Sequence, residues 1–327
     1  MIRDHPLVGD KTRNLTQTLT LTLRVRQITE EAEGILSFVL VDPTGMKLPA
    51  WTPGAHVDLV LPSGARRQYS LCGDPADRDR YRIAVRLNIQ GRGGSVEVHR
   101  LRPGDLLTIT SVRNTFALRE SESYLFVAAG IGITPILPMV RSAANDGIPS
   151  TLLYVGREEQ SLPFIEELTK LGTDMTLVLT AAQGRPSWKN FLEEANPRAI
   201  YCCGPDSLMN ELSEYTAAIG RSSLLRTERF TAAPVAAEES RSGQIRCARS
   251  RLTLATSPTQ SYLETLREAG IEIDSSCEMG ICGTCQVQLL SGEPDHRDSI
   301  LTQGERNDGA FLPCVSRSSS KELTLDI

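Results

Sequence analysis

The stretch Ser275-Ser276-Cys277-Glu278-Met279-Gly280-Ile281-Cys282-Gly283-Thr284-Cys285 places three cysteines within nine residues, and Cys314 follows after a gap of 28 residues. A Cys-x4-Cys-x2-Cys group with one distant cysteine is the plant-type arrangement of thiolate ligands for a 2Fe-2S cluster. Gly280 and Gly283 permit the tight backbone curl that such a loop needs. The sequence therefore predicts that Cys277, Cys282, Cys285 and Cys314 bind a 2Fe-2S cluster.

Two other interpretations of these cysteines fit the spacing less well. A zinc site usually pairs two Cys-x2-4-Cys knuckles, whereas here the fourth cysteine stands alone. A disulfide framework is typical of secreted chains, but the N-terminal residues Met1 to Pro6 show no apolar signal segment. We therefore expect a cytoplasmic protein whose clustered cysteines are metal ligands.

The whole-chain totals describe a multidomain globular protein. Its 327 residues are too many for one hydrophobic core and predict two or three domains. The net charge of -5 argues against nucleic acid as a partner. No apolar run approaches the length that spans a bilayer, so we expect no membrane partner.

The first part of the chain has the pattern of an antiparallel β-barrel. After an irregular arm over residues 1 to about 16, Leu19, Leu21, Leu23 and Val25 alternate with polar residues, as in a half-buried strand. Further short strands are expected at 34–40, 56–61, 81–86 and 106–109, separated by turns and without a long helix. This spacing predicts a barrel domain over residues 1–118.

The next part, residues 119–231, alternates strands with helices. Strands are expected at 124–129, 151–155, 175–180, 199–203 and 223–226, with helices at 136–144, 164–170 and 207–218 between them. Such alternation predicts an α/β domain in which a parallel sheet carries helices on both faces.

A linker over 232–243 precedes the last unit, residues 244–327. Within this unit we expect a strand over 249–254, a helix from Ser257-Pro258 to Gly270, and a strand pair at 285–290 and 322–326 around the cysteine loop. The unit carries 12 acidic and 8 basic residues, so most of the chain's net negative charge lies there. We interpret it as an α+β, β-grasp ferredoxin-like domain.

Two short segments of the barrel have the composition of a flavin site. Arg67-Gln68-Tyr69-Ser70 ends a strand, and Gly93-Gly94-Ser95 opens a short helical segment. Arginine and free N–H groups together can bind a phosphate, while Tyr69 offers a ring face and Ser70 a hydroxyl. His56 and His99 are expected to pack against the barrel.

Arg67-Gln68-Tyr69-Ser70 resembles the Arg-x-Tyr-Ser flavin motif of the ferredoxin reductase superfamily. Residues 19 to 327, in the order barrel, nucleotide domain, 2Fe-2S domain, resemble the phthalate dioxygenase reductase family, which includes vanillate demethylase reductases. The resemblance implies FMN, with Tyr69 on the isoalloxazine ring, Ser70 near the reactive N5, and the phosphate held by Arg67, Gly94 and Ser95. FAD stays open, because the sequence says little about an adenine pocket.

The nicotinamide site is expected at two strand ends. Gly130-Ile131-Gly132-Ile133-Thr134-Pro135 follows the first parallel strand and opens a helix, as a pyrophosphate-binding turn does. Cys203-Gly204-Pro205 ends the fourth strand, and the resemblance implies that Cys203 lies near the hydride path. In the loop after the second parallel strand, Arg157 could meet a 2'-phosphate, but Glu158 and Glu159 would repel one, which favours NADH.

Three redox sites in one chain predict a relay. A hydride carries two electrons and a 2Fe-2S cluster accepts one, so a flavin between them can exchange both. The resemblance implies a reductase that serves a Rieske non-haem iron oxygenase. Phe230, in Glu228-Arg229-Phe230, is expected to lie close to the flavin, with the ferredoxin domain folded against the barrel.

Three alternatives remain for the function: a diaphorase or flavin reductase acting on free acceptors, a redox sensor, and a subunit that supplies electrons to a dehydrogenase. The last usually has a shorter gap before the final cysteine than the one that separates Cys285 from Cys314. The sensor would ordinarily need an output module, and the predicted redox sites already occupy every segment.

Overall fold

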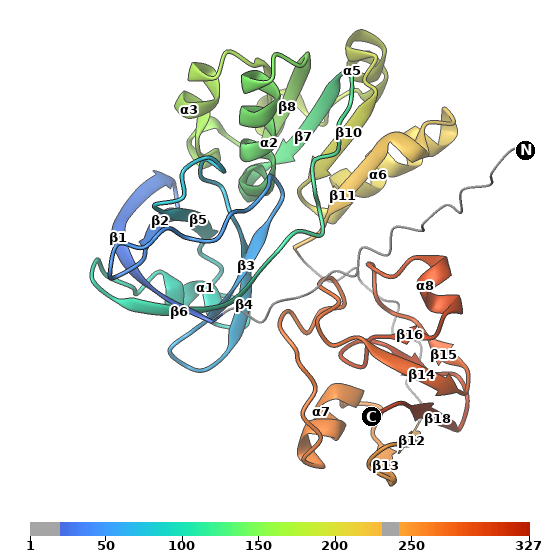
Figure 1. Ribbon diagram of the computed structural model, residues 1–327. Coiled ribbons are helices and arrows are strands. Elements are labelled where there is room, and N and C mark those ends of the chain that lie inside the picture. The colour runs from blue at the N-terminus through green and yellow to red at the C-terminus, as the bar shows by residue number, and fades with distance from the viewer. Residues whose placement is uncertain (1–19, 231–241) are drawn as a thin grey trace, which may run out of the picture.

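The computed structural model describes residues 20–230 and 242–327, and in these residues the chain forms three units joined in sequence. Figure 1 shows the first in blue and cyan, the second in green and yellow, and the third in orange and red. The N-terminal arm and most of the expected linker lie outside the described residues.

The first unit is a six-stranded antiparallel sheet in the order β4-β3-β6-β1-β2-β5. Its strands are β1 (Leu21–Ala32), β2 (Ile35–Val41), β3 (His56–Val60), β4 (Arg66–Ser70), β5 (Tyr81–Arg86) and β6 (Leu106–Arg113). An isolated bridge between Leu71 and Ile83 brings the β4 and β5 edges together, which confirms the predicted barrel.

Alternation in β1 positions the barrel core. Leu23 and Val25 are buried while Thr22 and Arg24 are exposed, because successive side chains of a strand point to opposite faces. β3 differs, since even its polar residues His56 and Asp58 are buried. Something other than solvent therefore covers the outer face of β3.

The second unit is a parallel sheet in the order β11-β10-β7-β8-β9. The strands are β7 (Tyr124–Ala129), β8 (Ser150–Gly156), β9 (Asp174–Leu179), β10 (Ala199–Cys203) and β11 (Leu225–Glu228). The boundary predicted at 118/119 lies between β6 and β7. Because the strands are covered on both faces, β7 is buried along its whole length.

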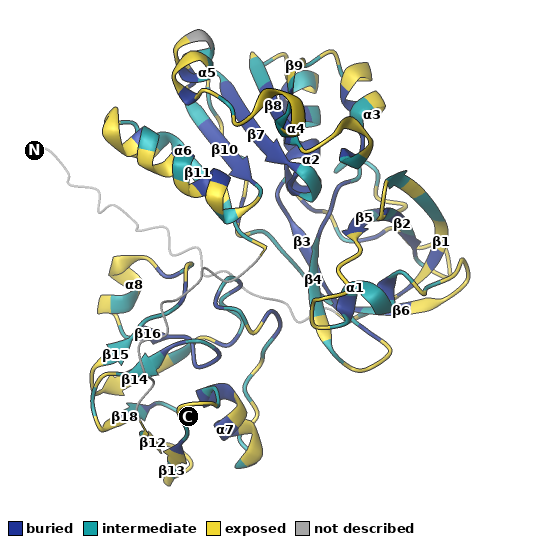
Figure 2. Ribbon diagram, turned by 180° about the vertical axis from the view of Figure 1, so that it is seen from behind, coloured by how far each residue is buried: buried dark blue, intermediate teal, exposed yellow. Residues whose placement is uncertain are grey.

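Helices cover both faces of this sheet, as predicted (Figure 2). One face packs on α2 (Ile133–Asn145) and α3 (Ile165–Lys170). The other packs on α5 (Trp188–Ala195) and α6 (Asp206–Ala218). The sequence pattern missed α5 because its apolar face is short.

The remaining helical elements are short. They are η1 (Gly130–Gly132), η2 (Glu159–Ser161), α4 (Thr180–Gln183) and η3 (Ser222–Leu224), and the barrel carries α1 (Gly94–Val98).

The third unit is a mixed sheet in the order β13-β12-β18-β14-β16 with a helix packed against it, as expected for a β-grasp domain. The strands are β12 (Gly243–Cys247), β13 (Leu252–Thr256), β14 (Val287–Ser291), β16 (Ala310–Phe311) and β18 (Glu322–Leu325), beside a separate pair, β15 (Pro294–Asp295) and β17 (Arg317–Ser318). The helices are α7 (Tyr262–Glu268) and α8 (Gln303–Asn307). The expected pairing of the strands near 285–290 and 322–326 is confirmed.

Two details of the predicted ferredoxin unit are wrong. The strand expected over 249–254 begins only at Leu252 as part of β13, because residues 249–251 belong to the hairpin turn after β12, in which Arg251 has a φ of 57°. The helix expected from Ser257-Pro258 begins instead after Ser261, whose hydroxyl accepts a hydrogen bond from the backbone N–H of Glu264. Because this capping box satisfies the first free N–H groups, the helix start lies there and not at the proline.

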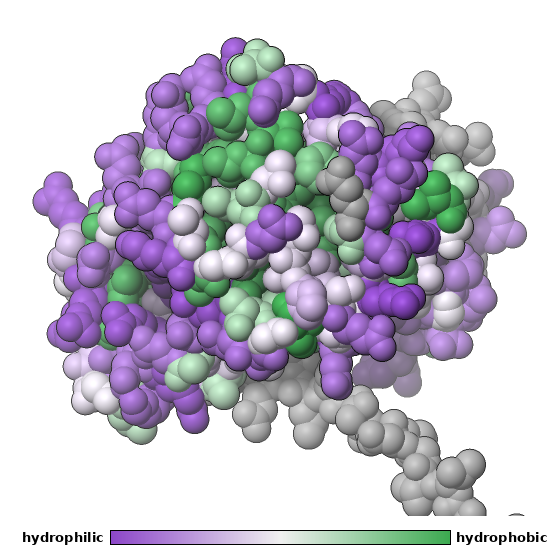
Figure 3. Space-filling model, turned by 90° about the horizontal axis from the view of Figure 1, so that it is seen from above, coloured by the Kyte–Doolittle hydropathy of each residue, from purple (hydrophilic) through white to green (hydrophobic). Residues whose placement is uncertain are grey.

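Seen from above, the surface is mostly hydrophilic, with hydrophobic residues gathered near the middle of the view (Figure 3). Among the described residues, no helix is both long enough and apolar enough to cross a membrane.

Candidate functional site

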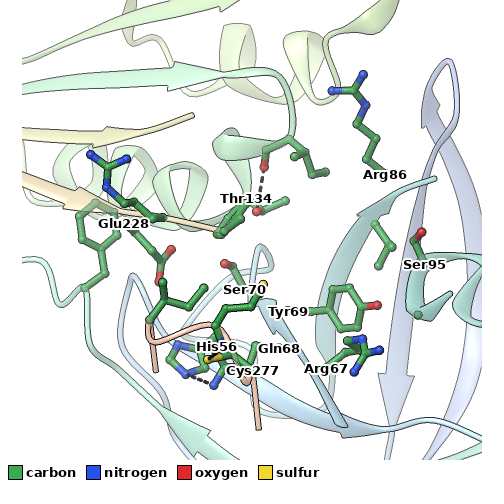
Figure 4. A pocket seen from close by; sticks show the side chains of 18 of the residues that line it. His56, Arg67, Gln68, Tyr69, Ser70, Arg86, Ser95, Thr134, Glu228 and Cys277 are labelled. Atoms are coloured by element: carbon green, nitrogen blue, oxygen red, sulfur yellow. Dashed lines mark hydrogen bonds between the residues drawn. The ribbon is translucent and has the colours of Figure 1, made fainter. Parts of the chain in front are cut away.

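A cavity of about 360 Å³ lies where the three units meet (Figure 4). The barrel contributes the Arg67-Gln68-Tyr69-Ser70 motif and the segment with Gly94 and Ser95. The nucleotide unit contributes Thr134 and the end of β11. The ferredoxin unit closes the cavity with Cys277, Met279, Ile281, Ser299 and Ile300.

The phosphate end of the predicted flavin site is built around Arg67. Its guanidinium donates to the carbonyl oxygens of Arg66 (2.8 Å) and Arg92 (3.2 Å). A Cβ at Gly94 would lie 2.7 Å from Arg67 Nε, so this close approach favours glycine. Ser95 Oγ accepts a hydrogen bond from the N–H of Asn88 at 2.9 Å. Gly93 has a φ of 80° and shapes the turn without lining the cavity.

Tyr69 and Ser70 line the middle of the cavity. Burial raises the pKa of Tyr69 to about 12, so its ring stays a neutral phenol at physiological pH. Figure 4 shows Ser70 between Tyr69 and Glu228, with Cys277 close below. A flat aromatic face and a neighbouring hydroxyl fit a planar heterocycle.

Glu228, at the end of β11, is a cavity residue to which the sequence analysis assigned no role. Burial raises the pKa of its carboxyl to about 8, against a smaller lowering by the Ser70 hydroxyl. Its Oε2 is shielded from solvent and has no hydrogen-bond partner within the described chain. At pH 7 the group is mainly a neutral carboxylic acid, which can donate a hydrogen bond to a ligand.

Phe230, two residues further on, also lines the cavity and is 37% exposed, and its closeness to the flavin stays a prediction. His56 is buried in β3, in line with the expected packing against the barrel, and it also lines this cavity. Burial lowers the pKa of His56 to about 4, with a further contribution from Arg113. Its ring is therefore neutral at pH 7. The sequence signal that could have placed His56 at the cavity is a histidine within an expected buried strand.

A second cavity, of about 690 Å³, lies at the carboxyl ends of the parallel strands. Of the predicted nicotinamide residues, Gly130, Arg157 and Pro205 line it, whereas Thr134 lines the first cavity. In open α/β sheets this edge is where nucleotides bind. The structure thus brings the two cavities to neighbouring sides of η1.

Gly132 and Cys203 have structural contacts that the sequence did not show. A Cβ at Gly132 would lie 2.2 Å from the carbonyl oxygen of Cys203, so β10 and α2 approach closely only at a glycine. The Cys203 thiol is 1% exposed, and burial raises its pKa well above the usual value. Neither Cys203 nor the neighbouring Gly204 and Pro135 lines either cavity, so their roles stay predictions.

The second cavity also contains a cation that the sequence analysis missed. Arg185 lines it and forms an ion pair with Glu211 of α6. Because the two are 26 residues apart and belong to different elements, no local pattern could have joined them.

The four cysteines of the ferredoxin unit meet in two pairs. The Cys277 thiol lies within hydrogen-bond range of Cys282, and that of Cys285 within range of Cys314. The described residues contain no group of three or more histidine, cysteine, aspartate or glutamate side chains around one point, as a single metal ion needs. Two thiolates for each of two irons is the arrangement that a 2Fe-2S cluster requires.

The backbone of the loop is also suited to a cluster. Gly280 and Gly283 have φ values of 69° and 71°. Backbone N–H groups approach the sulfurs, from Met279 to Cys277 at 3.3 Å and from Thr284 to Cys282 at 3.5 Å. Such hydrogen bonds to thiolates stabilise the reduced state of a cluster.

Comparison with known proteins agrees with this geometry. Residues 245–319 match the family described as the 2Fe-2S iron-sulfur cluster binding domain. The phthalate dioxygenase reductase of Burkholderia cepacia is 36% identical over 315 residues, which are 94% of this chain and 97% of that protein.

Two solved structures share the architecture. A phthalate dioxygenase reductase, described as a modular structure for electron transfer from pyridine nucleotides to 2Fe-2S, has a TM-score of 0.73 at 36% identity and covers 94% of this chain and 98% of its own. An intact type IV self-sufficient cytochrome P450 monooxygenase has a TM-score of 0.82 at 34% identity. The match covers 94% of this chain but only 41% of that larger protein.

Barrel, nucleotide unit and 2Fe-2S domain in this order define an oxidoreductase that carries electrons from a pyridine nucleotide through a flavin to an iron-sulfur cluster. The chain belongs to the phthalate dioxygenase reductase family. Several relatives in that family are reductases of oxygenase systems, and another is named as a tetrachlorobenzoquinone reductase.

Proposed function

We propose that this protein is the NADH-dependent reductase component of a multicomponent Rieske non-haem iron oxygenase, with FMN in the first cavity. The observation that carries the proposal is the lining of that cavity. Residues of the flavin motif, the end of β11 and the cluster loop enclose one space, so the ligand there is within reach of both the nucleotide unit and Cys277. The eight cysteines form no disulfide, which supports a cytoplasmic location.

Each group of residues has a distinct task. Arg67 and Ser95 hold the FMN phosphate, and Tyr69 packs against the ring. Ser70 and the neutral Glu228 supply hydrogen-bond donors at the ring edge beside the second cavity. Arg157 and Arg185 surround the adenosine end of NADH. When bound, FMN supplies two-electron acceptance with one-electron release, and the cluster carries one electron at a time.

The electron balance favours a protein acceptor. One NADH yields a proton and two electrons, whereas the cluster that Cys277, Cys282, Cys285 and Cys314 would hold passes one electron at a time, so an oxygenase with two one-electron steps would use both. A plant-type cluster has a reduction potential near -400 mV, which suits a protein partner of this kind better than most small organic acceptors. The resemblance to oxygenase reductase subunits across 94% of the chain supports the same partner class.

The test is an anaerobic NADH titration of the full chain, followed by visible absorption and low-temperature EPR. We expect flavin bleaching together with a rhombic signal from a reduced 2Fe-2S centre. Flavin bleaching without that signal, in protein with stoichiometric iron and sulfide, would place the cluster outside the electron path and favour a diaphorase or a sensor. Flavin released by heat and identified by chromatography distinguishes FMN from FAD.

A further inference from the structure

The outer face of the barrel carries a buried carboxylate that does not itself line the flavin cavity. Asp58 of β3 is 3% exposed and forms an ion pair with Arg113 of β6. It also accepts hydrogen bonds from Gln68 at 2.9 Å and from Ser111 at 2.8 Å. A charge buried this deeply is costly unless its partners are in place.

The cover over this carboxylate comes from the ferredoxin unit. Ser276, beside the predicted ligand Cys277, donates its hydroxyl to Asp58 at 2.9 Å. Arg113 donates to the hydroxyl of Thr284 at 2.6 Å. The Asp58–Arg113 pair therefore meets the cluster loop at both of its ends.

Two further arginines of the barrel reach the same loop. Arg92 donates to the carbonyl oxygen of Cys277 at 2.9 Å, and Arg66 makes a longer contact of 3.5 Å with the carbonyl oxygen of Ser275. The loop belongs to the acidic unit of the chain. Cationic barrel side chains thus face an acidic domain across this interface.

The contact continues to a cluster ligand. Thr284 Oγ1 lies 3.1 Å from the sulfur of Cys282, and the N–H of Thr284 points to the same sulfur. A connected path therefore runs from Asp58 through Arg113 and Thr284 to Cys282. A shift of Arg113 would be felt at the predicted cluster site.

We propose that the Asp58–Arg113 pair is the docking site that positions the ferredoxin domain on the barrel, with Ser276 and Thr284 as its counterparts. The pair acts as a positioning element: neither Asp58 nor Arg113 lines the two cavities, and Asp58 reaches the flavin cavity only through its contact with Gln68. The expected effect of docking on electron transfer rests on the proposed function, since the docked loop closes the flavin cavity. The docking itself is independent of electron flow.

Small-angle scattering of the oxidised, cofactor-loaded full chain provides the direct test. Arg113→Gln leaves Asp58 buried without its counter-ion, so undocking becomes favourable and we expect a larger radius of gyration. Arg249→Gln is the matched control, because Arg249 pairs with Asp326 at 72% exposure inside the ferredoxin unit. Equal radii for wild type and Arg113→Gln at low salt would overturn the proposal.

Stopped-flow mixing with NADH separates docking from chemistry. In Arg113→Gln we expect flavin bleaching at the wild-type rate and cluster reduction slowed by about tenfold or more, the factor for losing a charge-assisted contact. Thr284→Val should slow it less, and Arg113→Gln/Thr284→Val should be non-additive because the two side chains touch. Strict additivity would contradict the contact.

A second variant keeps the test valid if Arg113→Gln folds poorly. Asp58→Asn/Arg113→Gln removes both charges, so it should recover a smaller radius than Arg113→Gln alone. If wild-type cluster is not reduced by NADH at all but Arg113→Gln still expands, the proposed function fails and the docking site stands. If neither Arg113→Gln nor the double variant has a larger radius of gyration than wild type, the docking proposal is wrong and the proposed function is unaffected.

Discussion

Glu228 is the residue whose chemistry depends most on its surroundings. It stands at the end of a parallel strand, where a carboxylate would usually face solvent, yet it lies in the cavity against Ser70 with one oxygen unpartnered within the described chain. At neutral pH its carboxyl is therefore mainly protonated only in the folded state.

This state predicts a pH-dependent stability. The pKa of the carboxyl rises from 4.5 to about 8 on folding, so between these values the folded state holds a proton that the unfolded state has lost. Stability should therefore fall as the pH rises through this window and level off above pH 8, by up to about 5 kcal/mol in total. Thermal melts of wild type and Glu228→Gln between pH 5 and 9 measure the slope.

Glu228→Gln should lose most of that slope, because its amide does not titrate. Glu122→Gln is the control, since Glu122 is 85% exposed in a surface ion pair and should leave the slope unchanged. Parallel slopes for Glu228→Gln and wild type would show that another group is responsible.

Arg185 and Glu211 give the second prediction at this scale. In the second cavity, Glu211 neutralises a cation that could otherwise meet a 2'-phosphate. Glu211→Gln should raise kcat/KM for NADPH relative to NADH by about tenfold, the factor for one charge-assisted contact. Glu214→Gln, an exposed position on the same helix, is the matched control, and an unchanged ratio in Glu211→Gln would contradict the idea.

Among the secondary-structure elements, the start of α2 and the end of β10 approach each other closely. Gly132 lies directly before α2, and the backbone of Cys203 at the end of β10 occupies the space that a Cβ would need. Two backbones this close leave no flexible side chain that could move aside.

Gly132→Ala should therefore lower the free energy of unfolding by about 1–3 kcal/mol, the usual cost of overpacking. Urea denaturation of the holoenzyme, followed by the fluorescence of Trp51 and Trp188, measures it. Gly304→Ala in α8 is the control, because the nearest atom to its Cβ would be 4.0 Å away. Equal midpoints for the two variants would contradict the close approach.

At the scale of the whole molecule, three units share one ligand cavity. A ligand that binds only the folded state stabilises it by mass action, by about 2.7 kcal/mol at a hundred times its Kd. Here the stabilisation should be distributed over segments far apart in sequence.

We expect FMN, added to protein from which it was removed, to increase hydrogen-exchange protection in residues 67–70, 227–230 and 277–281 together. All three segments contribute to the cavity lining. Strand β18, remote from the cavity, serves as the internal control. Protection confined to 67–70 would mean that the other two units do not contact the ligand.

The sequence by itself determined the cofactor chemistry and the order of the units. Cys-x4-Cys-x2-Cys, the Arg-x-Tyr-Ser motif and the alternation of strands with helices are local patterns, because ligand spacing and strand periodicity depend on neighbours in the chain. These patterns predicted the barrel, the parallel sheet and the β-grasp class. They failed at the β12–β13 hairpin, where Arg251 adopts a positive φ without a glycine to signal it.

Only the tertiary structure decided which distant groups meet. The cavity placement of Glu228 and His56, the Arg185–Glu211 pair and the contact of Arg113 with Thr284 join residues from different elements or domains. Such pairings depend on how sheets pack, and burial then sets the charge of each group. The sequence therefore specified the cofactor classes and the order of the units, while the fold determined how the predicted sites face one another.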